Sequence, residues 1–228
     1  KVTEPLTEDE IKQIIAAYAQ AASDAQKVGF DGIELHGAHG YLIDQFLWEN
    51  TNKRTDKYGG DLVGRTTFAQ EVVKACREAV GPDFLIVFRY SQWKLGDYGA
   101  KLAHNSEELK QLLQPISEAG VDVFHASTRR FWEPEFAEES DSWNLAAWTK
   151  QVTGKPTITV GSLGLDHAFR DENGAANETS ISENIEKLIS KIQQDEFDLV
   201  AVGRALLADP KWASKLKDGV LEKAVPYS

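Results

Sequence analysis

The sequence contains a single cysteine, Cys76, no methionine and no long apolar run. One cysteine cannot form an internal disulfide or supply a cysteine-ligated cluster alone, so we expect a reducing compartment, the cytoplasm. No apolar segment approaches the ~20 residues that a membrane helix requires, so we expect no membrane partner. Because methionine is absent even at the first position, we expect Lys1 to lie inside a longer native polypeptide.

Positive charge is also scarce, because 25 Lys and Arg stand against 36 Asp and Glu and leave a net charge of −11. Binding to a nucleic-acid backbone depends on clustered Lys and Arg, so we expect no nucleic-acid partner and a small-molecule substrate instead. The apolar fraction of 42% and the charged fraction of 27% are typical of a folded globular protein. A chain of 228 residues fits a single domain, and a homo-oligomer is compatible with these features.

Short apolar strands alternate with amphipathic helices along the chain. The first helix is predicted over residues 7–28, where Thr7 followed three residues later by Glu10 forms a capping-box pattern. The predicted strands cover residues 30–36, 84–91, 121–128, 156–162 and 197–204. The other predicted helices cover residues 65–80, 106–119, 144–152, 182–195 and 205–217. This alternation predicts a parallel sheet with right-handed crossovers.

Two architectures fit such a pattern, an open doubly wound sheet and a closed (β/α)8 barrel. An open sheet usually carries a G-x-G-x-x-G loop after its first strand, and no such loop follows any predicted strand here. The α/β class with a (β/α)8 TIM barrel is therefore favoured. The predicted strands are too few to close it, so we expect this chain to supply about strands 4 to 8, with the earlier strands coming from sequence before Lys1.

The segment HGAHGYL, after the first predicted strand, places His36, His39 and Tyr41 in one short loop. Catalytic groups of a barrel lie at the carboxyl ends of its strands and in the loops that follow. Two imidazoles three residues apart can both donate to one oxygen, and a nearby phenol can supply a proton. Two alternatives stay open, that the histidines satisfy backbone groups at the strand end or that they bind a metal. Zinc sites draw three or four ligands, so we expect no metal.

Arg89 and three glycines mark the ends of other strands. Arg89 projects from the apolar segment FRYSQW, where an unpaired charge is costly, so it either faces an electron-rich ring atom or pairs with a carboxylate. Gly161 and Gly164 lie in VGSLG, and Gly203 precedes Arg204 in VGRALLADP. Such turns can bind phosphate through backbone N–H groups and an arginine. The alternative is that the glycines only permit tight turns.

The segment GFDGIELHGAHGYLIDQFLWENTNKRTDKYGG, followed by GRTTF, strongly resembles the Old Yellow Enzyme family of FMN-dependent NAD(P)H oxidoreductases. The resemblance continues through FRYSQW, TVGSLG and VAVGRALLADPKW and covers nearly the whole chain. It implies a single FMN-binding TIM-barrel domain over residues 1–228 that lacks the N-terminal strands. It also implies that NADH or NADPH reduces noncovalently bound FMN, which then passes hydride to an activated alkene.

The same resemblance implies a role for each candidate residue. His36 and His39 would bind the carbonyl or nitro oxygen of the substrate, and Tyr41 would protonate the carbon alpha to it. Many family members carry Asn at the position of His39, so the imidazole here implies a different substrate preference. Arg89 would lie against the N1 and O2 edge of the flavin. The residues that would hold the FMN phosphate are Gly161, Ser162, Gly203 and Arg204.

Two rival functions remain beside an NAD(P)H-dependent flavin oxidoreductase. A phosphate-binding barrel without redox chemistry, such as an aldolase or isomerase, generally needs a lysine or an acid–base carboxylate at a strand end. None of the predicted strand ends presents a lysine. An inactive barrel fragment would keep the motifs without binding flavin.

Overall fold

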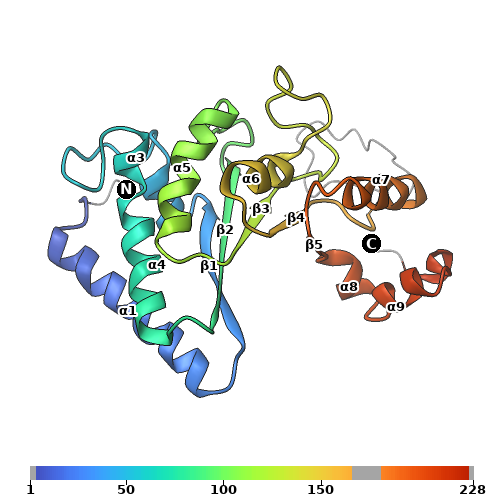
Figure 1. The fold of residues 1–228 in the computed structure, drawn as a ribbon, viewed down its shortest axis with the longest axis horizontal. Helices are drawn as coiled ribbons and strands as arrows, with labels where there is room; N and C mark the ends of the chain where they lie inside the picture. The colour runs from blue at the N-terminus through green and yellow to red at the C-terminus, as the bar shows by residue number, and fades with distance from the viewer. Residues whose placement is uncertain (1–3, 166–180, 226–228) are drawn as a thin grey trace.

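In a computed structural model, which describes residues 4–165 and 181–225, the chain forms one parallel β-sheet covered by helices (Figure 1). The strands are β1 (Gly32–His39), β2 (Leu85–Lys94), β3 (Val123–Ser127), β4 (Thr157–Val160) and β5 (Leu199–Ala201). They pair in the order β1-β2-β3-β4-β5, and each neighbouring pair is parallel. Each strand therefore lies beside the next one along the chain.

Helices connect consecutive strands and cover one face of the sheet (Figure 1). They are α1 (Glu8–Lys27), α2 (Leu42–Leu47), α3 (Leu62–Arg65), α4 (Thr67–Val80), α5 (Ser106–Glu118), α6 (Leu145–Thr153), α7 (Ile181–Gln193), α8 (Arg204–Ala208) and α9 (Trp212–Lys217), with a 3-10 turn η1 (Leu221–Lys223). Over the described ranges, none of the helices has both the length and the apolar character needed to span a membrane.

The strand order distinguishes the two architectures that the sequence allowed. A doubly wound sheet contains a point where the order of its strands reverses. The described strands follow one another from β1 to β5 without a reversal. This order is that of consecutive strands in a (β/α)8 barrel.

Several predicted boundaries differ from the structure. Strand β1 continues to His39 and β2 continues to Lys94, beyond their predicted ends. The helix predicted over residues 205–217 is two helices, because Asp209 between them is extended, with φ −136° and ψ 97°. Asp209 precedes Pro210, whose ring disfavours the helical conformation at the preceding residue. The short helices α2 and α3 were not predicted, because the predicted helix over residues 65–80 corresponds to α4.

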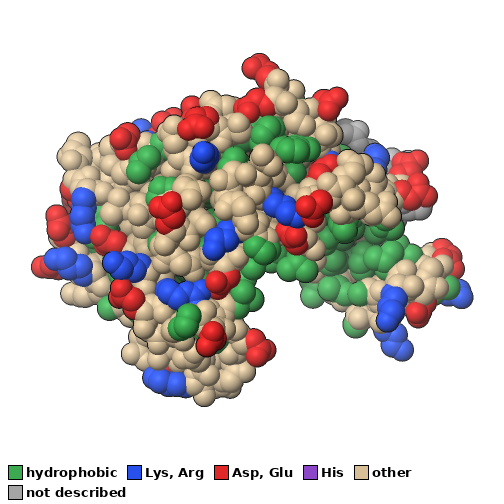
Figure 2. Space-filling model, viewed as in Figure 1, with side chains coloured by type: hydrophobic (Ala, Val, Ile, Leu, Met, Phe, Trp, Pro, Cys, Tyr) green, Lys and Arg blue, Asp and Glu red, His purple; other side chains and the backbone are tan. Residues whose placement is uncertain are grey.

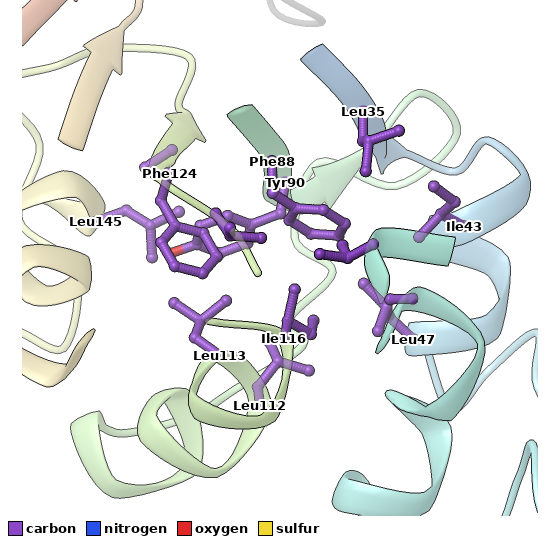
Figure 3. Packing of buried hydrophobic residues seen from close by; sticks show 14 of the residues in the cluster. Leu35, Ile43, Leu47, Phe88, Tyr90, Leu112, Leu113, Ile116, Phe124 and Leu145 are labelled. Carbon is purple, nitrogen blue, oxygen red and sulfur yellow. The ribbon is translucent and has the colours of Figure 1, made fainter. Parts of the chain in front are cut away.

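The apolar core lies between the sheet and the covering helices. Phe88 and Tyr90 on β2 and Phe124 on β3 are fully buried, and Figure 3 shows them beside Leu113 and Ile116 of α5. The alternation of side chains along a strand places every second residue on this face. The packing of these rings therefore fixes which residues of each strand face the other side.

A polar row lies on the opposite face, which corresponds to the barrel interior. The strand register pairs Arg89 of β2 with His36 of β1 and with His125 of β3. These residues alternate with the buried rings, so their side chains share the interior face. A slip of one residue would exchange the two faces, which means that the apolar core also holds the polar row in place.

Asn144, the N-cap of α6, connects this helix to the loop after β3 and to β4. Its buried side chain accepts from Ala147 N–H at 2.9 Å and donates to the Phe131 carbonyl at 2.7 Å and to Thr159 Oγ1 at 3.1 Å. We expect Asn144→Ala to lower the free energy of unfolding by about 2–4 kcal/mol, because it removes a helix cap and leaves buried groups unpaired. Urea denaturation followed by circular dichroism measures this change.

The matched control is Asn105→Ala. Asn105 caps α5 through one hydrogen bond from Glu108 N–H, at 2.8 Å. Loss of that cap alone is expected to cost about 1 kcal/mol. Equal losses in the two variants would contradict the additional role of Asn144.

Candidate active site

A pocket opens at the carboxyl-terminal edge of the sheet, where barrels carry their functional residues. Most of the candidate residues line it, namely His39, Arg89, Gly161, Ser162, Gly203 and Arg204. Tyr41 lines a neighbouring pocket, to which His39 also contributes. The structure thus brings the ends of β1, β2, β4 and β5 together around one space.

The three candidate catalytic rings lie next to one another. The centroid of the His36 ring is 5.1 Å from that of His39 and 5.2 Å from that of Tyr41. His36 and His39 belong to β1 itself, so the prediction that all three residues lie in one loop is wrong for the histidines. Tyr41 follows the strand and precedes the first turn of α2, and it is 53% exposed. The phenol is therefore open to a ligand.

A turn with left-handed backbone positions His39. Its φ is +64° and that of Gly40 is +84°, and the register of β1 with β2 shifts between Gly37 and His39. The His39 N–H donates to Ser91 Oγ at 3.0 Å, and its carbonyl accepts from Leu95 N–H at 3.3 Å. A non-glycine residue with positive φ is uncommon, so these bonds help to hold a conformation that the chain would otherwise avoid.

Both histidines are held in the neutral form. Burial and then the charge of Arg89 lower the pKa of His36 below its ordinary value. The same two causes, in the same order, lower the pKa of His39 to about 3. A neutral imidazole has one N–H donor and one acceptor nitrogen. Near neutral pH each ring can therefore donate one hydrogen bond to a substrate oxygen.

Arg89 lies in the interior row and has few partners. Its Nη2 donates to Ser127 Oγ at 3.1 Å, and its Nη1 lies 4.0 Å from a carboxylate oxygen of Glu34. Glu34 instead accepts from His125 Nδ1 at 2.7 Å. The Nε of Arg89 is buried and has no hydrogen-bond partner within the described part of the chain. Of the two expectations for Arg89, a close carboxylate partner fits less well than a ligand acceptor.

The glycines of the pocket differ in whether the backbone would accommodate a side chain at their positions. Gly161 has φ +141°, and a Cβ there would approach the backbone of Arg129 and Arg130 to 2.8 Å, so its turn needs glycine. A Cβ on Gly203 would meet nothing within 4 Å. Ser162 Oγ donates to the Arg129 carbonyl at 2.9 Å. The requirement for a tight turn therefore explains the glycine at position 161, whereas no neighbouring atom requires a glycine at position 203.

Trp93 and Ser127 are among the pocket residues that were not identified from the sequence. Trp93 stacks on His39 with ring centroids 4.2 Å apart and an interplanar angle of 22°, and it donates from Nε1 to the Ser127 carbonyl at 3.0 Å. Ser127 ends β3 and is buried. Trp93 stands in the FRYSQW segment, but nothing in its position along the chain indicated the ring that it would contact.

A buried ion pair supports the same turn. Lys94, the last residue of β2, donates to Asp44 Oδ1 at 2.8 Å and to the Ser91 carbonyl at 3.1 Å, while Asp44 Oδ2 accepts from Gly40 N–H at 2.6 Å. The side chains are 3% and 0% exposed. Burial lowers the pKa of Lys94 and raises the pKa of Asp44. The statement that no strand end presents a lysine is thus wrong, because β2 extends to Lys94, but this amine is paired and enclosed.

We expect Lys94→Met to lower the free energy of unfolding by about 3–5 kcal/mol, because the Asp44 carboxyl group would stay buried without its cation. The control is Lys57→Met, which removes the exposed Lys57–Glu71 pair and is expected to cost at most about 1 kcal/mol. Urea unfolding measures both. Asp44→Asn added to Lys94→Met should restore part of the loss, and no restoration would argue against the ion pair as the cause.

The chain matches the model of the NADH:flavin oxidoreductase / NADH oxidase family over residues 1–223. It is 40% identical over 220 residues to an NADH oxidase of Thermoanaerobacter brockii, covering 94% of this chain and 30% of that protein. It is 32% identical over 239 residues to an NADPH dehydrogenase of Clostridium acetobutylicum, covering 100% of this chain and 61% of that protein. The chain thus spans less than two thirds of the length of either relative.

The fold also resembles that of solved structures. Morphinone reductase in complex with tetrahydroNAD superimposes with a TM-score of 0.70 at 26% identity, covering 96% of this chain and 52% of that one. An Old Yellow Enzyme from a Pichia species superimposes with a TM-score of 0.72 at 25% identity, covering 99% and 52%. The predicted partial TIM barrel and the predicted resemblance are confirmed. The chain belongs to the NADH:flavin oxidoreductase / NADH oxidase family, which includes the Old Yellow Enzymes.

Proposed function

We propose that the protein is an FMN-dependent oxidoreductase that transfers hydride from NADH or NADPH to an activated alkene or a similar electrophilic acceptor. The observation that carries this proposal is the pocket at the carboxyl edge of the sheet that joins the His39 side of β1 to the glycine turns after β4 and β5. Family membership and relatives named NADH oxidase and NADPH dehydrogenase support it.

The described residues fit FMN at both ends of the pocket. Arg89 carries only donors, and its buried Nε has no partner among residues 4–165 and 181–225, which suits the electron-rich edge of a flavin ring. Gly203 and Arg204 line the other end, where backbone N–H groups and a guanidinium suit a phosphate. Gly161 and Ser162 complete this end of the pocket. We assign these residues to FMN binding.

Bound FMN would supply the hydride carrier between NAD(P)H and the acceptor. The chain's own residues would bind and orient that acceptor. His36 and His39, both neutral, each offer one N–H, and donation to a carbonyl or nitro oxygen withdraws electrons from the conjugated double bond. Tyr41, exposed beside them, would give its phenolic proton to the carbon alpha to the activating group.

We also propose that residues 1–228 belong to one FMN-binding domain. The family match over residues 1–223 and the uninterrupted strand order support this assignment. The cytoplasmic location and the homo-oligomer stay predictions from the composition.

Anaerobic titration with NADH or NADPH tests the redox function. We expect the full-length protein to take up FMN and its visible flavin absorption to bleach on addition of one of the two nucleotides. A protein that binds FMN but is not reduced would point away from the NAD(P)H reaction. A protein that takes up no FMN would favour a barrel without redox chemistry or an inactive fragment.

Gly203→Val adds a side chain to a glycine that lines the pocket and should weaken FMN binding about tenfold or more, by displacing charge-assisted contacts to phosphate. The control is Gly99→Val, because a Cβ on Gly99 would approach only Asp97 Oδ1, at 3.5 Å, and Gly99 lines neither this pocket nor the neighbouring pocket of Tyr41. Fluorescence titration of FMN measures both affinities. Equal affinities in the two variants would argue against phosphate binding at Gly203.

Tyr41→Phe should slow reduction of an activated alkene on the order of 100-fold, since it removes the proton donor. The rate at which NAD(P)H reduces the bound flavin should stay nearly unchanged, because that step does not use the phenol. Stopped-flow measurement separates the two half-reactions, and Tyr18→Phe on α1 serves as the control. Equal loss in both half-reactions would remove Tyr41 from the role of acid.

A further inference from the structure

The hydroxyl group of Ser127 connects two functional side chains of the pocket. Its Oγ lies 3.1 Å from Arg89 Nη2 and 2.8 Å from His39 Nε2. Ser127 is 2% exposed. Arg89 comes from β2, His39 from the end of β1 and Ser127 from the end of β3, so the contact spans three adjacent strands.

Counting protons assigns a direction to these bonds. A guanidinium has donors only, so Arg89 donates and the Ser127 oxygen accepts. The single hydroxyl proton of Ser127 then has His39 Nε2 as its hydrogen-bond acceptor in the described part of the chain. If His39 Nε2 carried a proton instead, the buried hydroxyl of Ser127 would donate to nothing, which is costly. The arrangement therefore favours donation from Arg89 to Ser127 and from Ser127 to His39.

We propose that Ser127 is a positioning residue that holds His39 in the tautomer protonated at Nδ1. In this tautomer His39 donates a hydrogen bond from Nδ1–H to the electrophilic substrate that accepts the hydride. The role rests on the proposed function of His39, because only a bound acceptor makes the choice of nitrogen matter for the reaction. Ser127 itself does not need to touch that acceptor. The proposal also gives Arg89 a second role, which is to orient the Ser127 hydroxyl.

Three further observations support the assignment. Burial and the charge of Arg89 lower the pKa of His39 to about 3, so the ring is neutral near pH 7 and the choice between tautomers is real. Trp93 stacks on the imidazole at 4.2 Å and donates to the Ser127 carbonyl, which limits rotation of the ring away from Ser127. Among the described residues, no hydrogen bond from protein engages His39 Nδ1, so this nitrogen is available to a ligand.

Nitrogen-15 NMR of the histidine side chains tests the tautomer directly. Long-range proton–nitrogen correlation distinguishes a protonated from a nonprotonated ring nitrogen, and the His39→Asn variant identifies the His39 signals by their loss. In the full-length protein, labelled and freed of FMN, we expect Nδ1 of His39 to be protonated and Nε2 to be bare at pH 7. A wild-type His39 protonated at Nε2 would overturn the proposal without any variant of Ser127.

Substitutions then test whether Ser127 is the cause. Ser127→Ala should shift the ratio of the two His39 tautomers about fivefold or more toward Nε2–H, as expected for the loss of one hydrogen bond. Ser127→Thr keeps the hydroxyl and should restore the wild-type ratio. An unchanged ratio in Ser127→Ala would overturn the proposal.

Two controls separate this effect from general disturbance. Ser117→Ala removes the hydroxyl of another buried serine, on α5 and outside the pocket, so its His39 tautomer ratio should stay that of the wild type. The signals of the exposed His104 should be the same in every variant. Because the tautomer is read without FMN or substrate, failure of this proposal is distinct from failure of the redox function, which would appear as absent FMN uptake or absent reduction.

Discussion

The parallel register of β1, β2 and β3 is the constraint on which the rest of the site depends. It aligns His36, Arg89 and His125 in one interior row, while Phe88, Tyr90 and Phe124 face the helices. Because side chains alternate along each strand, the apolar packing on one face determines the polar chemistry on the other. The same parallel pairing brings the carboxyl ends of all the strands to one edge, where the pocket opens.

The charged side chains near the pocket fall into two groups, a buried ion pair that holds a turn and an arginine that faces the pocket. Lys94 and Asp44 neutralise each other inside the protein and hold the turn that carries His39. Arg89 places its charge within the pocket, where it adds to the effect of burial in lowering the pKa of both histidines, and its Nε has no hydrogen-bond partner among the described residues. Figure 2 shows acidic and basic side chains scattered over the viewed surface with no broad basic area, which is consistent with a ligand recognised inside a pocket.

Much of this arrangement could be predicted from the sequence. Apolar periodicity predicted the five strands and most of the helices between them, and residue type with position after a strand indicated Arg89, Gly161 and Gly203, which line the pocket. The extension of β1 to His39 could not be predicted, because it depends on a hydrogen bond to the distant Ser91 and on the left-handed backbone of His39 and Gly40. The hydrogen bonds of Ser127 with His39 and Arg89 were also missed. They join residues of three different strands, whereas the periodicity of a sequence describes each strand separately.

A crystal structure of the full-length protein with FMN tests the central claim most directly. The account predicts the flavin ring beside Arg89, with its phosphate at Gly203 and Arg204, and the side of the ring near His36, His39 and Tyr41 open to an acceptor. A flavin bound elsewhere, or a phosphate held away from the turns after β4 and β5, would contradict it.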